Sequence, residues 1–336
     1  MRITFDLRRV GLGDNGGSST IINSANTLAD LGNEVFVIDS GKNQHTWTPL
    51  KVKHIIINKI EKIPDADFII ATGYKSVGPT VNAPSRCGIK LHWMRGWETW
   101  QMSEKNIIEQ ILRAPTIKVV NGIGLHGKLE QHRCQSHIIR PGYDIDNFKP
   151  LGIRQKNKKI ILGGLYNEGR GKQLKRTSWI YEAAFRIKRI MGVEFWLFGT
   201  HPQPKGFLID RYIQKPSLKE KNDFYNHINI WLAPTALEGL HMPPAEAMLT
   251  GCPVIATNTE MNGMWDYLSD MKTGLVCEDK QDSFIKAIEK LINMKDLQIE
   301  LGNNAREKIL KLGSRKENMT KFVDLMRRLK DENTQR

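Results

Sequence analysis

Residues 233–258, APTALEGLHMPPAEAMLTGCPVIATN, decide how this sequence is interpreted. An apolar run ends at Pro234, and a loop containing Gly239 follows. A short helix is predicted over residues 243–250, because proline is well placed in the first turn of a helix. Gly251 would end this helix. The amide groups of such a loop, together with the amino terminus of the helix, form a binding site for anions such as a diphosphate.

The residues of this loop and helix are candidate ligands of a nucleotide. The amides of Gly239, Leu240 and His241 are the candidate hydrogen-bond donors to a diphosphate. Glu246 is expected in the first turn of the helix, where the dipole favours a carboxylate that could also accept hydrogen bonds from a ribose or sugar diol. Each glutamate also has an interpretation without a ligand. Glu246 could do no more than complement the helix dipole, and Glu238 could be a solvated loop carboxylate.

The chain on either side alternates strand-like and helical patterns. Apolar runs at residues 2–7 and 34–39 flank a helical pattern over residues 20–31, which predicts a β-α-β unit. Similar runs continue to residue 122, and the pattern restarts at residue 159 after a polar, lysine-rich stretch. The predicted fold class is α/β, with parallel sheets covered by helices.

The length of 336 residues suits two domains of roughly 150 residues each. We predict one domain over residues 1–150 and a second over residues 151–314, both doubly wound and facing each other across a cleft. A helical pattern within residues 315–336 places four apolar side chains on one face, namely Phe322, Leu325, Met326 and Leu329. Because such a face must be buried, we expect this helix to pack back on the N-terminal domain.

The order of motifs within residues 233–258 resembles a known family signature. Two glutamates separated by seven residues, the glycine, the prolines and the strings EAM and GCPVIAT follow one another. They are similar to the signature of the family-four retaining glycosyltransferases (glycosyl transferases group 1), in which an EG-(F/L) loop precedes a helix beginning near P-x-x-EAM-x-x-G-x-PV. Residues 140–150, RPGYDIDNFKP, resemble the interdomain motif, and residues 256–292 resemble the region after the signature. The resemblance implies a GT-B fold with two Rossmann-like domains.

The resemblance also implies an activity. It implies transfer of a sugar from a nucleotide-diphosphate sugar to a hydroxyl acceptor, such as a glycan or glycolipid, with retention of the anomeric configuration. Glu238 would bind donor-sugar hydroxyls, Glu246 would bind the ribose, and Ile213 would lie near the nucleobase. The nucleotide sugar would be a substrate, so no cofactor is expected, and because an arginine and a lysine bind the diphosphate in the resembled family, no metal is expected. A nucleotide-sugar epimerase or a phosphorylase on the same scaffold is the alternative enzyme.

Charge that develops on the diphosphate must be neutralised as the sugar leaves. In the resembled family, an arginine and a lysine after the first strand of the second domain do this. Gly164 occupies the position where the arginine is common, so Arg170 is the candidate substitute. Lys175 is the best match to the lysine, with Lys172 as the alternative, and a solvated basic helix start remains an open interpretation. Glu238, Arg170 and Lys175 form the candidate catalytic set.

The amino-terminal stretch GLGDNGG (11–17) contains a G-x-G-x-x-G spacing. One interpretation is a nicotinamide dinucleotide site, supported by Asp39 about twenty residues later, where a ribose-binding acid would lie. However, LRRV (7–10) separates these glycines from the strand-like run, whereas the dinucleotide motif begins at the end of a strand. The family resemblance instead implies that Gly16 and Gly17 form the glycine loop of the acceptor domain. An inert connection is the third alternative.

Residues 89–100, IKLHWMRGWETW, are similar to a strand and turn that carries QDYE in one subgroup of the family. The resemblance assigns Arg95 and Glu98 to the acceptor side, with Arg95 in place of the family's Gln or His. His92 is expected to be a structural histidine within the strand. Three aromatic side chains could either stack on a sugar ring or pack in the core, namely Trp93, Trp97 and Trp100.

The formal charge of +14 favours an anionic partner, such as nucleic acid, a phosphate-bearing ligand or an anionic membrane surface, or it reflects a lysine-rich proteome. No helix-turn-helix, zinc-finger or RNA-recognition signature is present, so no nucleic acid partner is expected and a basic nucleic-acid-binding protein is only the alternative class. There is no secretory h-region and no run near the roughly 20 apolar residues that span a bilayer. The four cysteines lie far apart, without disulfide-scaffold or metal-ligand spacing. We expect a cytoplasmic protein that could associate with a membrane surface.

Overall fold

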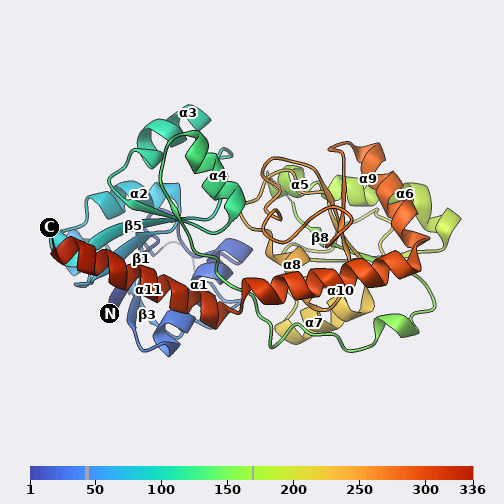
Figure 1. Cartoon of the computed structure of the whole chain (residues 1–336), viewed down its shortest axis with the longest axis horizontal. Helices are drawn as coiled ribbons and strands as arrows, with labels where there is room; N and C mark the ends of the chain where they lie inside the picture. Colours follow the sequence, from blue (N-terminus) through green and yellow to red (C-terminus); the bar gives the residue numbers. More distant parts are fainter. Residues whose placement is uncertain (42–44, 169, 336) are drawn as a thin grey trace. The chain divides into compact units, whose positions relative to one another are not determined.

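Two parallel sheets organise the chain, one in each of two units. The computed structural model describes residues 1–41, 45–168 and 170–335, and of residues 170–172 it describes the helical backbone alone. One unit is Met1–Gly142 with Arg315–Arg336, and the other is Tyr143–Ser314. The predicted α/β fold class with two doubly wound units is confirmed (Figure 1).

The first unit contains a seven-stranded sheet in the order β3-β2-β1-β4-β5-β6-β7. Its strands are β1 (Arg2–Asp6), β2 (Glu34–Asp39), β3 (Lys53–Ile56), β4 (Phe68–Ala71), β5 (Ile89–Met94), β6 (Ile117–Val120) and β7 (His137–Ile138). Its helical segments are α1 (Gly16–Asp30), η1 (Ile60–Lys62), α2 (Tyr74–Val81), η2 (Ser85–Cys87), α3 (Glu104–Asn106), the π-helical turn η3 (Ile107–Leu112) and α4 (Ile123–Gln131). The central strands are apolar on both faces, as expected for a parallel sheet covered by helices.

Helix α1 begins earlier than its apolar pattern predicts. The Asn15 side chain caps the helix by accepting a hydrogen bond of 2.9 Å from the Ser18 amide, so the helix starts at Gly16 rather than at residue 20. The first turn, GGSST, carries no apolar periodicity, which is why the pattern alone misses it. Gly32, with φ of +83°, follows the end of the helix in a left-handed conformation that suits glycine.

The second unit contains a six-stranded sheet in the order β10-β9-β8-β11-β12-β13. Its strands are β8 (Ile161–Tyr166), β9 (Glu194–Gly199), β10 (Arg211–Gln214), β11 (Ile230–Ala233), β12 (Val254–Thr257) and β13 (Leu275–Cys277). Its helices are α5 (Arg170–Lys175), α6 (Thr177–Met191), α7 (Leu218–His227), α8 (Met242–Leu249), α9 (Gln281–Ile292) and α10 (Lys295–Leu312), with the short η4 (Arg154–Lys156) before β8. The chain thus repeats the architecture of the first unit.

The last helix, α11 (Arg315–Thr334), packs on the first unit beside α1 (Figure 1). Its apolar face joins the first unit's core, where Phe322 lies 5.4 Å from the Trp93 ring, measured between centroids. Lys330 also forms an ion pair of 2.6 Å with Asp67, which precedes β4. The helix therefore buries the face that its apolar spacing indicates.

The boundary between the units lies before the predicted residue 150. The Tyr143 amide donates a hydrogen bond of 3.3 Å to the carbonyl of Gly313, at the end of α10. Phe148 is fully buried and packs edge-on against Tyr225, with ring centroids 5.6 Å apart. Residues 143–150 consequently belong to the second unit. No helix in the described ranges is both long enough and apolar enough to cross a membrane.

Each sheet has a point at which the strand order reverses. In the first sheet this point lies between β1 and β4, and in the second between β8 and β11. Open parallel sheets bind ligands in the crevice outside the carboxyl ends of the strands at such a point. The glycine stretch follows β1, α5 follows β8, and the loop with Glu238 follows β11. The topology therefore places these three segments at the two reversal points.

Candidate functional site

The loop between β11 and α8 is held by backbone hydrogen bonds to residues 261–263. The Glu238 amide donates to the carbonyl of Met261 at 2.6 Å, and the His241 amide donates to the carbonyl of Gly263 at 2.9 Å. A Cβ at Gly263, whose φ is +72°, would lie 2.6 Å from the Cβ of Glu238, so only glycine fits. The predicted role of the His241 amide is wrong, because that N–H is already bonded within the protein.

Helix α8 starts at Met242, one residue before the predicted start. Pro243 and Pro244 lack an amide hydrogen, so Met242 supplies the free N–H at the first helical position and the two prolines supply none. Glu246 lies in the second turn, and its predicted place in the first turn is wrong. The helix dipole therefore does not explain this carboxylate, since its effect falls off within the first turn.

Glu246 is instead held by two side chains of α7. Lys221 Nζ lies 2.9 Å from Oε1 and 2.7 Å from Oε2, and the Tyr225 hydroxyl donates to Oε2 at 2.8 Å. The side chains of Lys221 and Glu246 are only 13% and 12% exposed. Burial and the neighbouring carboxylate raise the pKa of Tyr225 well above its usual range, so the hydroxyl keeps its proton. The carboxylate is thus fixed in orientation by an ammonium group and a hydroxyl group.

Sequence reasoning missed both partners of Glu246, although one local signal was available. Ser217 and Glu220 form a capping box, in which the Ser217 side chain bonds the Glu220 amide and the Glu220 carboxylate bonds the Ser217 amide. This motif fixes the start of α7 and therefore puts Lys221 and Tyr225 on one face, four residues apart. The sequence does not reveal that this face meets α8.

The end of α5 meets the same loop. The Ala236 amide donates to the carbonyl of Leu174 at 2.8 Å, and the neighbouring Lys175 ammonium contacts the Glu238 carboxylate. Burial lowers the pKa of Lys175 to about 7. The structure thus brings Lys175 and Glu238 together. Arg170 begins α5, but its side chain, like that of Lys172, lies outside the described part of the structure.

Gly164 lies within β8, which continues to Tyr166. A Cβ at Gly164 would lie 2.6 Å from Cδ1 of Ile180 and 3.1 Å from Cδ2 of Leu197, both in the core. An arginine therefore cannot be accommodated here, and the predicted cations that remain are those of α5. Ile213 lies in the edge strand β10, and its half-buried side chain packs against the core of the second unit.

In the first unit, Gly16 and Gly17 open helix α1. The Arg95 guanidinium ties this point to the end of β4: Nη1 donates to the carbonyl of Gly17 at 2.6 Å, while Nε and Nη2 donate to the carbonyl of Thr72 at 3.2 and 2.7 Å. A Cβ at Gly17 would lie 3.2 Å from Arg95 Nη1, which accounts for the glycine. All three nitrogens of Arg95 are therefore engaged by backbone carbonyls.

Glu98 lies beside the start of α2. Its Oε2 accepts a hydrogen bond of 3.2 Å from the Tyr74 amide, and burial raises the pKa of its carboxyl group. Burial also lowers the pKa of Arg95 to about 10, which leaves the guanidinium charged at neutral pH. The structure thus gathers Gly17, Arg95 and Glu98 at the reversal point of the first sheet.

The nicotinamide interpretation of the glycine stretch meets two geometric obstacles. Strand β1 ends at Asp6, and a turn closed by a hydrogen bond of 2.9 Å from the Gly11 amide to the Leu7 carbonyl separates it from the glycines. Asp39 is fully buried and accepts a hydrogen bond from the Ser40 amide, so it does not present a carboxylate to a ribose diol. The glycines do not begin at the strand end, as that motif requires.

Two of the tryptophans that could have stacked on a sugar belong to the core. Trp93 is fully buried against α11 and Trp97 is 3% exposed, whereas Trp100 is half-buried over Gly96. His92 is also buried, which lowers its pKa to about 3 and keeps the ring neutral. Core packing is therefore the interpretation that the structure supports for Trp93, Trp97 and His92.

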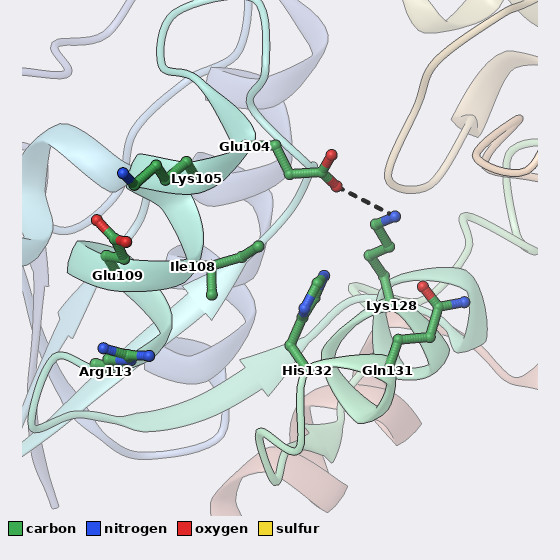
Figure 2. A pocket seen from close by; sticks show the side chains of 8 residues that line it. All are labelled: Glu104, Lys105, Ile108, Glu109, Arg113, Lys128, Gln131 and His132. Atoms are coloured by element: carbon green, nitrogen blue, oxygen red, sulfur yellow. Dashed lines mark ion pairs between the residues drawn. The ribbon is translucent and has the colours of Figure 1, made fainter.

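A hollow of about 490 Å³ lies on the first unit between α3, η3 and α4 (Figure 2). Lys128 and Glu104 face each other across it in an ion pair of 3.2 Å, drawn as the dashed line in Figure 2. The Trp97 indole donates to Glu104 at 3.1 Å, and the His132 ring stacks on Trp97 with centroids 5.8 Å apart. None of the predicted site residues lines this hollow.

Carboxylate pairs are candidate ligands for divalent cations, and the triplets 65–67 and 144–146 have the form Asp-x-Asp. Asp67 is already bonded to Lys330 and to the Arg2 amide, and Asp144 accepts a hydrogen bond of 3.2 Å from the Asn147 amide. Among the described residues, no group of three or more histidine, cysteine or acidic side chains is placed to hold a metal ion.

Comparison with known proteins gives matches in the second unit and over the whole chain. Residues 160–294 match the family model for Glycosyl transferases group 1. A stretch of 87 residues is 36% identical to the capsular polysaccharide biosynthesis glycosyltransferase CapM of Staphylococcus aureus, covering 26% of this chain and 22% of CapM. The match thus spans less than a quarter of that relative's length.

Solved structures are similar over nearly the full chain. Sucrose-phosphate synthase from Thermosynechococcus elongatus has a TM-score of 0.74 at 16% identity, covering 98% of both chains. Anabaena HepE in complex with UDP-glucose has a TM-score of 0.77 at 13% identity, covering 96% of this chain and 99% of HepE. At these identities the likeness shows the shared fold alone.

Proposed function

We propose that this chain, which has the GT-B fold and belongs to the glycosyl transferases group 1 family over residues 160–294, transfers a sugar from a nucleotide-diphosphate sugar to a hydroxyl group of an acceptor. One observation carries the proposal. At the reversal point of the second sheet, Lys175 contacts Glu238 in the loop between β11 and α8, and Glu246 lies on the helix that follows this loop. The match to the family model spans all three residues.

The roles of these residues follow from their chemistry. Lys175 and the amides of Gly239 and Leu240 would bind the diphosphate, since cations and oriented N–H groups stabilise the charge that the leaving group develops. Glu246, held in place by Lys221, would accept hydrogen bonds from the ribose diol. Glu238 would bind hydroxyls of the donor sugar, and Arg170 would add a second positive charge.

The proposed transfer retains the anomeric configuration. The bond between the anomeric carbon and the diphosphate oxygen breaks, and the acceptor oxygen bonds to the anomeric carbon from the same face. The acceptor's proton passes to the departing diphosphate oxygen, so the nucleoside diphosphate leaves with that proton. This route requires no general base from the protein and no metal ion, and the nucleotide sugar is consumed as a substrate.

The acceptor is proposed to be a glycan or glycolipid, bound on the side of Gly16, Gly17, Arg95 and Glu98. We also propose that the enzyme acts in the cytoplasm, at an anionic membrane surface. The net charge of +14 supports this location, because such a surface attracts basic proteins. No sequence signature supports a nucleic acid partner.

A donor screen tests this function. Purified protein is incubated with UDP-, GDP- and ADP-sugars with and without a mixture of glycan acceptors, and release of nucleoside diphosphate is measured. We expect one donor to react, and Glu238→Gln to lower kcat by roughly a hundredfold, as for loss of a transition-state contact. Glu289→Gln, on the exposed face of α9, is the matched control and keeps the wild-type rate. Absence of binding and turnover with every donor would overturn the proposal, and a new sugar nucleotide formed without acceptor would indicate an epimerase instead.

A further inference from the structure

The imidazole of His241 has one ring nitrogen that is bonded and one that is not. The residue is 3% exposed, and its Nδ1 lies 3.3 Å from the hydroxyl of Thr235, at the end of β11. Nε2 is buried and has no hydrogen-bond partner among the described residues. Buried polar atoms in native proteins are almost always bonded, so an exception calls for a function or a missing partner.

The protonation of this ring can be assigned from its neighbours. Burial and the positive charge of Lys175 lower the pKa of His241 well below its usual range, so the ring is neutral and carries one N–H. If the Thr235 hydroxyl donates to Nδ1, the Nε2–H is the one group of this pair of side chains that has no partner among the described residues. In the opposite tautomer, both the Thr235 proton and the Nε2 lone pair would lack partners among the described residues. The first arrangement leaves fewer buried groups unsatisfied and is therefore favoured.

The backbone around the ring is fixed on both sides. The His241 amide is bonded to the Gly263 carbonyl, and the His241 carbonyl accepts a hydrogen bond from the buried Tyr267 hydroxyl. The residue is also the N-cap of α8, next to the Met242 amide. A fixed donor near the Lys175 charge and the helix amino terminus disfavours a cation and suits an anionic oxygen.

We propose that His241 is a donor-binding residue whose neutral imidazole donates its Nε2–H to a phosphate oxygen of the nucleotide diphosphate. The inference rests on the proposed function and adds a side-chain contact to it. The ligand completes the hydrogen bonding of a group that the protein leaves unpaired. The contact is specific for the phosphates, so a nucleoside without phosphate does not benefit from it.

The test measures binding by calorimetry. Wild-type protein is titrated with UDP, GDP and ADP. The diphosphate that binds, and the nucleoside with the same base, are then titrated into each variant. His241→Phe removes the donor but keeps an aromatic ring, and we expect it to weaken diphosphate binding roughly tenfold or more while nucleoside binding is unchanged. His241→Gln, whose amide keeps an N–H at the reach of Nε2, should recover most of the affinity. His227→Phe, on α7 and with its ring bonded to its own helix, is the matched control and should bind as wild type.

The pH dependence separates a neutral donor from a cation. The ratio of wild-type to His241→Phe affinity should be the same at pH 6.5 and pH 8, because the ring is neutral at both. Any of three results would overturn the inference about His241 and leave the proposed function standing. These are an affinity ratio that grows toward low pH, equal affinities of the two proteins for the diphosphate, and an equal loss of nucleoside binding. If the folded wild-type protein binds none of the three diphosphates, the proposed function fails as well.

Discussion

The two sheets reverse their strand order at equivalent points, but the polar side chains at the two points differ in their hydrogen-bond partners and pKa values. In the first unit, Arg95 is half-buried, has a pKa of about 10, and donates from all three side-chain nitrogens to backbone carbonyls. In the second unit, burial brings Lys175 to a pKa of about 7, and His241 Nε2 has no partner among the described residues. A buried hydrogen-bonding group without a protein partner is a candidate to bind a ligand, whereas the nitrogens of Arg95 already have protein partners. This contrast supports the proposal that the second point binds the diphosphate and that Arg95 holds the backbone at the first.

The largest effect is expected when the buried ion pair of the second unit is broken. Glu246→Ala leaves the Lys221 ammonium, 13% exposed, without its carboxylate, and leaves the Tyr225 hydroxyl without its acceptor. We expect the free energy of unfolding to fall by about 3 kcal/mol, the usual cost of removing one partner of a buried pair. Urea unfolding of the full-length chain measures this.

The matched control for Glu246→Ala is a pair in solvent. Asp324→Ala breaks the contact of 3.2 Å with Arg327 on α11, where the side chains are 57% and 67% exposed, and exposed pairs contribute little. We expect no measurable change. If Glu246→Ala were as mild as Asp324→Ala, the carboxylate would not be fixed by Lys221.

Much of the architecture could be predicted because it depends on local patterns. Apolar runs of strand length and helical spacing gave the two α/β units, and the face containing Phe322 predicted a buried last helix. The loop before α8 was also predictable, since glycine and proline act through their own backbone. The start of α1 was missed because the Asn15 cap precedes a turn with no apolar periodicity.

The missed parts of the site depend on contacts between segments distant in sequence. Lys221 reaches Glu246 from 25 residues away, and the His241 amide is occupied by Gly263. Gly164 was aligned with an arginine, but the core position of β8 excludes any side chain there. Roles of single groups depend on such partners, which a linear pattern does not contain. The binding roles of Glu238, Glu246 and Ile213 stay predictions.

A smaller effect is expected from the first unit. Arg95→Met removes the donors to the carbonyls of Gly17 and Thr72, and we expect a loss of about 2 kcal/mol in the free energy of unfolding, as for backbone groups left unsatisfied. Affinity for the nucleoside diphosphate should stay within twofold of wild type, because this guanidinium is engaged by the protein. Arg95→Lys, whose ammonium cannot bridge both carbonyls, should be intermediate in stability. A large loss of nucleotide affinity with unchanged stability would reverse the roles assigned to Arg95 and Lys175.

The smallest effect is a dependence of nucleotide affinity on pH. In the protein without ligand, burial lowers the pKa of Lys175 to about 7. A bound diphosphate favours the charged ammonium and therefore raises that pKa. Above pH 7, binding must therefore take up a proton, so affinity falls as pH rises, by roughly fivefold from pH 7 to pH 8. Calorimetry at pH 8 in two buffers of different ionisation enthalpy should show uptake of close to one proton by wild type and none by Lys175→Met. Lys290→Met, on the exposed face of α9, should behave as wild type. If the affinity does not change between pH 6.5 and pH 8.5, Lys175 does not take up a proton when the diphosphate binds. The cation at the second reversal point would then keep a constant charge, as Arg95 does at the first.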